Sequence, residues 1–154
     1  HLIFHQDIQE EHRNDPSGIQ GINVRNIKNQ KNMLRALLIV GSGSFVGGAL
    51  RYLISQLMKP VSTGFPVGTF SVNIIGCFLI GLIYGLFARY SSSSSDWCLL
   101  LTTGLCGGFT TFSTFCNESM TMVQSGSWGT LFLYIGGSIV LGLAAVFLGH
   151  AITN

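Results

Sequence analysis

Four apolar runs, each long enough to cross a lipid bilayer, make up most of this 154-residue chain. About 20 helical residues are enough to cross the hydrocarbon of a membrane. The runs cover approximately residues 34–57, 67–89, 97–123 and 128–151. Because the joints between them are too short for a soluble domain, consecutive runs must be antiparallel. The sequence therefore predicts an all-α integral membrane protein with four transmembrane helices and both ends on one side.

Residues 1–32 have a different composition from the rest of the chain. They hold four of the six acidic residues and four of the eight Lys and Arg residues. They show no helical or strand periodicity, and they lack the apolar core of a secretory signal. We predict that residues 1–32 form a disordered extension without a function, and that residues 33–154 form the membrane domain.

Pairs of glycines spaced four residues apart predict where the membrane helices approach one another closely. Small residues at this spacing allow two helix backbones to come into contact within a bilayer. The pairs are Gly43 and Gly47, Gly81 and Gly85, and Gly104 and Gly108. They indicate close packing and not a ligand.

The distribution of basic residues between the two sides of the membrane predicts how the chain inserts. Without the extension, Arg35 and Arg89 lie on the side of the termini and Lys59 lies on the other. So weak a bias allows insertion in both orientations, and two inverted copies can then pair. With the extension counted, the bias rises to six against one. The expectation of dual topology therefore depends on the extension being absent from the native chain.

Polar residues within the first two runs are candidates for functional positions, because polar groups are costly at membrane depth. Arg51 lies near the end of the first run, where reaching the headgroups and lining an aqueous vestibule are both open interpretations. Asn73 lies inside the second run, one helical turn after Thr69. Its amide suits either a hydrogen bond between helices or the donation of N–H groups to an anion in a pore.

The third run contains the unusual stretch GGFTTFSTF, residues 107–115. Paired glycines and paired threonines form helices poorly, so we predict a broken helix between Gly107 and Thr111. Backbone carbonyls freed by such a break are suitable ligands for a hard monovalent cation. Glu118 follows, where it could pair with Arg51 or lie at a pore mouth.

Aromatic and hydroxyl side chains alternate in the second part of this stretch. Phe112 and Phe115 are three residues apart and share a helical face. Packing explains most phenylalanines in membranes, but ring edges carry partial positive charge and can also solvate a small anion. In the fourth run, Tyr134 and Ser138 lie one turn apart, where packing is the common interpretation.

Three motifs in order resemble the Fluc fluoride channels, also called CrcB. They are GGALRY at 47–52, GTFSVNIIGCFLIG at 68–81 and GLCGGFTTFSTF at 104–115, and the resemblance extends over residues 34–152. It implies a passive fluoride-selective channel of the plasma or inner membrane, built as an antiparallel, dual-topology homodimer. It also implies two pores and a central structural sodium ion. The implied partners are a second copy, fluoride and the lipid bilayer, with no nucleic acid and no enzymatic activity.

The resemblance also implies a role for individual residues. The backbone carbonyls of Gly107 and Thr110 would hold the sodium ion. The implied fluoride-path residues are Arg51, Asn73, Phe112, Ser113, Thr114, Phe115, Glu118, Tyr134 and Ser138.

A small multidrug-type four-helix exporter is the alternative function. A proton-coupled pump of that class would need a carboxylate within its first span. The chain has no acidic residue between Pro16 and Ser95, so the sequence disfavours this alternative.

Overall fold

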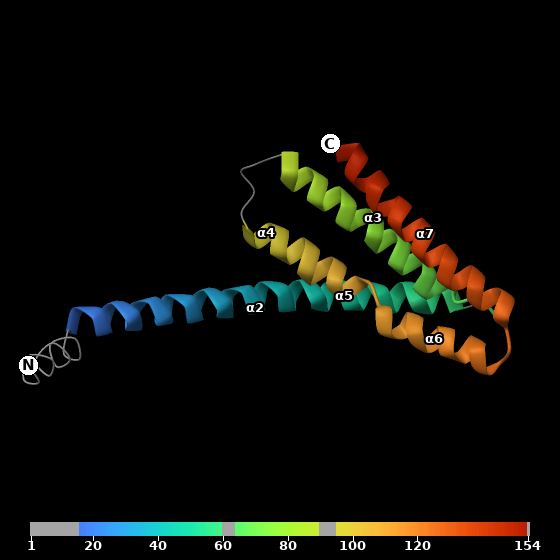
Figure 1. Ribbon diagram of the computed structural model, residues 1–154, viewed down its shortest axis with the longest axis horizontal. Coiled ribbons are helices and arrows are strands. Elements are labelled where there is room, and N and C mark those ends of the chain that lie inside the picture. Colours follow the sequence, from blue (N-terminus) through green and yellow to red (C-terminus); the bar gives the residue numbers. More distant parts are fainter. Residues whose placement is uncertain (1–15, 60–63, 90–94, 154) are drawn as a thin grey trace, which may run out of the picture. The chain divides into compact units, whose positions relative to one another are not determined.

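The computed structural model describes residues 16–59, 64–89 and 95–153 (Figure 1). The chain divides into two units, residues 1–37 and 38–154, which are described separately below. The described part is helical and contains no strand. Its elements are α2 (Pro16–Met58), α3 (Val67–Arg89), α4 (Ser95–Leu99), the π-helical η2 (Leu100–Cys106), α5 (Gly107–Phe109), α6 (Phe112–Gln124) and α7 (Trp128–Thr153).

Among the described residues, four helical segments are long and apolar enough to cross a membrane, as the sequence predicts. They are Arg25–Met58, Val67–Arg89, Asp96–Gln124 and Trp128–Thr153. The chain is therefore a multi-pass membrane protein.

The N-terminal extension differs from its prediction. Helix α2 begins at Pro16, so residues 16–32 are helical where we expected disorder, and residues 1–15 lie outside the described part. Proline is favoured at the first position of a helix because its fixed φ suits the first turn. Once a helix is nucleated, each further residue adds a hydrogen bond at little cost. The apolar run that follows can supply such a nucleus.

In the second unit, α3 lies alongside α7 (Figure 1). The two backbones meet at glycines on both helices: Gly81 contacts the backbone of Val146, and Gly149 contacts the backbone of Phe78. Gly85 contacts the side chain of Thr153 near the far end of the pair. The second predicted glycine pair is thus confirmed as a helix contact.

The part of α2 that belongs to the second unit packs in the same way on the third span. A Cβ added to Gly43 would lie 2.9 Å from the Cα of Gly104, and one added to Gly108 would lie 2.7 Å from the Cα of Ser44. Gly47 meets the backbone carbonyl of Leu105. The remaining glycine pairs are also confirmed as close contacts.

The third span is interrupted two residues after its glycine pair. Gly107 is helical, with φ −64° and ψ −37°, and α5 continues to Phe109. Thr110 (ψ 159°) and Thr111 (φ −147°, ψ 116°) have extended backbones before α6 begins at Phe112. Within the predicted stretch Gly107–Thr111, the extended backbone is therefore confined to the two threonines, and the glycines are helical and serve packing.

Candidate functional site

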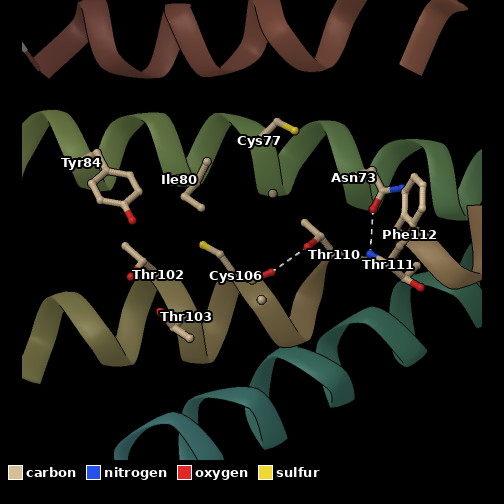
Figure 2. Close-up of a pocket in the computed structure, with 12 residues that line it drawn as sticks. Asn73, Cys77, Ile80, Tyr84, Thr102, Thr103, Cys106, Thr110, Thr111 and Phe112 are labelled. Carbon is tan, nitrogen blue, oxygen red and sulfur yellow. Dashed lines mark hydrogen bonds between the residues drawn. The ribbon is translucent and has the colours of Figure 1, made fainter. Parts of the chain in front are cut away.

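The side-chain amide of Asn73 on α3 pairs with the backbone of Thr111 in the third span (Figure 2). Its Nδ2 donates to the Thr111 carbonyl at 3.2 Å, and its Oδ1 accepts from the Thr111 N–H at 2.9 Å. Of the two interpretations that the sequence leaves open, the hydrogen bond between helices is present. One N–H of the amide donates to Thr111, and an amide NH₂ has two.

The same contacts explain why two backbone carbonyls lose their helical partners. In a continuous α-helix, the N–H of Thr111 would donate to the carbonyl of Gly107 and that of Thr114 to the carbonyl of Thr110. Here the Thr111 N–H donates to Asn73. The Thr114 N–H donates to the Thr111 hydroxyl at 3.3 Å, which caps α6. The carbonyls of Gly107 and Thr110 are consequently released from the helical pattern.

A groove of about 470 Å³ runs between α3 and the third span beside this interruption. Asn73 and Phe112 lie toward one end of it and Tyr84 toward the other (Figure 2). The methyl group of Thr110 packs against Gly76, where no larger residue would fit. The groove therefore combines an apolar wall with the polar groups of the interruption.

Glu118 on α6 joins three helices through its carboxyl group. Oε1 accepts from the Thr69 hydroxyl of α3, and Oε2 accepts from the Tyr134 hydroxyl of α7, both at 2.7 Å. Tyr134 is completely buried. Of the two alternatives for Glu118, the ion pair with Arg51 is absent among the described residues of the single chain.

Aromatic rings connect the groove to this carboxyl group. Phe112 and Phe115 are stacked, with centroids 6.0 Å apart and an interplanar angle of 29°. The Phe115 ring lies 5.0 Å from that of Tyr134. Phe112 is 77% exposed in the isolated chain, whereas Phe115 is partly buried. The two rings therefore lead from the exposed start of α6 to the half-buried carboxyl group of Glu118.

Two further rings, those of Phe65 and Phe70, lie beside Phe115 and Tyr134 and were not predicted from the sequence. The ring centroids of Phe65 and Phe70 are 5.3 Å apart, and Phe65 lies 5.5 Å from Tyr134 in an edge-to-face arrangement. Phe70 belongs to the motif GTFSVNIIGCFLIG, but its position in that motif does not reveal that its ring lies beside Tyr134 of the fourth span.

The remaining predicted positions are hydroxyl and basic groups. The Thr111 hydroxyl donates to that of Thr114 at 2.9 Å and lies 3.4 Å from that of Ser113. Ser138 Oγ and Arg51 Nε are buried and have no hydrogen-bond partner among the described residues. Most of the predicted residues thus lie around the interruption or around the carboxyl group of Glu118. Arg51 makes no hydrogen bond to either group within the described part of the chain.

The model of the family described as "CrcB-like protein, Camphor Resistance (CrcB)" matches residues 38–150. The chain belongs to the CrcB family. Curated proteins similar to it include the fluoride-specific ion channel FluC of Phocaeicola vulgatus, 49% identical over 75% of this chain and 96% of the relative. The FluC proteins of Chlorobium phaeobacteroides (strain BS1) and Oceanobacillus iheyensis are 46% and 44% identical, over 74% and 75% of this chain and 89% of each relative. The CrcB match begins after the extension.

Proposed function

We propose that this chain forms a fluoride-selective channel that lets fluoride leave the cell passively and so lowers its toxicity. The similarity to curated CrcB relatives named fluoride-specific ion channels, over almost their whole length, supports the substrate. The observation that carries the proposal is the interruption of the third span, because it brings an amide, hydroxyls and aromatic rings to one groove within a membrane protein.

These groups suit an anion that must lose its water. A selective pore has to replace the hydration shell of the ion with groups of the protein. The second N–H of Asn73, the hydroxyls of Ser113 and Thr114, and the ring edges of Phe112 and Phe115 are available for this replacement. We assign Glu118, Tyr134, Ser138 and Arg51 to the same path, with Ser138 Oγ and Arg51 Nε as buried polar atoms that lack a partner among the described residues.

A structural sodium ion is the second part of the proposal. The carbonyls of Gly107 and Thr110 lose their helical partners to Asn73 and Thr111. Carbonyl oxygens are the ligands that a hard monovalent cation accepts, so these two residues fit the ion. When bound, it would supply positive charge close to the anion path.

An antiparallel homodimer with two pores is the third part. The protomer leaves Phe112 and Ser113 exposed on a membrane-spanning helix. An exposed hydroxyl inside a bilayer favours a covering protein surface over lipid. A second, inverted copy would provide that surface.

Purified protein in fluoride-loaded liposomes tests the channel. We expect rapid fluoride release and negligible release of chloride from matched vesicles, and a well-folded protein that releases no fluoride would overturn the proposal. The variants Phe112→Ile and Phe115→Ile should lower the flux without preventing assembly. Phe132→Ile is the matched control, because Phe132 is 71% exposed on α7 and lies outside the ring cluster.

Replacing sodium by a large organic cation tests the ion separately. If sodium holds two copies together, the dimer should lose thermal stability in the organic cation while its helix content persists. Equal stability in both salts would contradict the sodium site and leave the channel proposal standing.

A further inference from the structure

The polar groups around Asn73 and Glu118 account for only one half of the membrane. Asn73 lies about 9 Å from the start of α3, a helix of 23 residues that is about 35 Å long at 1.5 Å per residue. Glu118 accepts a hydrogen bond from Thr69, which lies even closer to that start, and another from Tyr134 in the first part of α7. An ion that reaches the interruption therefore has the other half of the bilayer still to cross.

The groove beside the interruption continues into that other half (Figure 2). Along α3 it is lined by Asn73, Cys77, Ile80 and Tyr84, among other residues. These four share one helical face, because each follows the one before by three or four residues. Tyr84 comes about 16 Å after Asn73 along the helix, which is about half of the hydrocarbon thickness. The groove thus leads from the interruption toward the end of α3.

Two hydroxyl groups are available at that end of the groove. Tyr84 is 53% exposed in the isolated chain, and Thr103 on η2 is also exposed. Both residues line the groove, and neither hydroxyl makes a hydrogen bond to another residue that the structure describes. Thr102 lies beside them, but its hydroxyl already donates to the carbonyl of Cys98 at 2.7 Å. The O–H groups of Tyr84 and Thr103 can therefore donate to an ion.

We propose that the hydroxyls of Tyr84 and Thr103 bind fluoride at this mouth of the groove. Hydroxyl donors can replace water molecules in the hydration shell of an anion. Between this mouth and Asn73 the groove is lined by apolar side chains such as Ile80 and Cys106. The anion would then lose water in two steps, first at the mouth and then at the interruption. This inference rests on the proposed fluoride function and adds two residues to the path.

Fluoride flux from liposomes, measured over a range of fluoride concentrations, tests the mouth. Tyr84→Phe removes only a hydroxyl, and Thr103→Val replaces a hydroxyl by a methyl group of similar size. Each variant should lower the flux at low fluoride roughly tenfold, as expected for the loss of a hydrogen bond to an ion. Each should also raise the fluoride concentration that gives half-maximal flux. Tyr52→Phe is the matched control and should keep both values, because Tyr52 is 63% exposed on α2 and is not among the residues that line the groove.

Two results would overturn the inference and leave the channel proposal standing. One is a flux in both variants that equals that of Tyr52→Phe. The other is a lower maximal flux with an unchanged half-saturating concentration and a lower thermal stability, which would show that the hydroxyls support the fold and do not bind the ion. If the unmodified chain released no fluoride, the proposed function itself would fail, and this inference with it.

Discussion

The two halves of the third span are held to their neighbours in different ways. The half before the interruption meets α2 through Gly104 and Gly108, which face Gly43 and Ser44 at backbone distance. The half after it meets α3 and α7 through Glu118, whose carboxyl group accepts hydrogen bonds from Thr69 and Tyr134.

The difference separates a part that packs from a part that can act on an ion. Close backbone contact fixes one half by van der Waals packing and leaves no room for added atoms. The other half is held by polar groups, and polar groups at membrane depth are costly unless they are hydrogen-bonded or have a function. The two halves should therefore be sensitive to different substitutions. A larger side chain should destabilise the first half, and the loss of a polar group should destabilise the second.

Adding one methyl group at the glycine contact should have the largest effect on stability. A Cβ at position 47 would collide with the carbonyl of Leu105 and lie 2.8 Å from the backbone N of Phe109. Gly47→Ala should thus lower the free energy of unfolding by about 3 kcal/mol, the upper part of the usual range for overpacking. Thermal unfolding in detergent measures this loss.

The neighbouring glycine supplies the control. A Cβ at Gly48 would have no atom within 4 Å among the described residues. Gly48→Ala should keep or raise stability, because alanine is the better helix former. Equal destabilisation by both variants would contradict close packing at this half.

Removing the carboxyl group should lower the free energy of unfolding by about as much in total. Glu118→Leu leaves the hydroxyls of Thr69 and Tyr134 without their acceptor, at a cost of about 1.5 kcal/mol for each hydrogen bond. Fluoride flux should fall to background in the same liposome assay. Thr69→Val and Tyr134→Phe each remove one donor and should each show part of the loss in stability. Unchanged stability in all three variants would show that the carboxyl group does not hold the half-span.

Substituting Asn73 should lower stability less, but it should change the backbone of the interruption itself. Asn73→Leu removes both hydrogen bonds to Thr111, at about 1 kcal/mol for each. The Thr111 N–H is then free to return to the carbonyl of Gly107, which would lengthen the helix and close the proposed sodium site. We expect the thermal stability of this variant to be the same in sodium and in the organic cation. A sodium dependence as large as that of the unmodified chain would contradict this coupling.

Much of the fold could be predicted because hydropathy and glycine spacing are local properties. The four apolar runs gave the spans, and glycines four residues apart gave the helix contacts. Residues 16–32 were mispredicted because their helical state continues that of the span, which their own composition does not reveal.

The site was harder to predict because it depends on residues that are distant along the chain. The break predicted between Gly107 and Thr111 is confined to the two threonines, since Asn73, 38 positions earlier, takes the N–H of Thr111. Glu118 could be singled out as a rare carboxylate, but its partners come from two other helices. Periodicity within one helix carries no information about such contacts.

Removing the N-cap of α6 should lower stability least. It tests which residue fixes the start of the half-span that follows the interruption. Thr111 accepts from the Thr114 N–H through its hydroxyl, so Thr111→Val should cost about 1 kcal/mol, as for other N-caps. Valine keeps the shape and the extended preference of threonine, so the contact with Asn73 should persist. Thr121→Val is the control, because within the described part of the chain the Thr121 hydroxyl donates only to the carbonyl of Asn117 in its own helix. If Thr111→Val destabilises no more than Thr121→Val, the start of α6 is fixed by Asn73 alone, and the polar half begins on α3 rather than at its own cap.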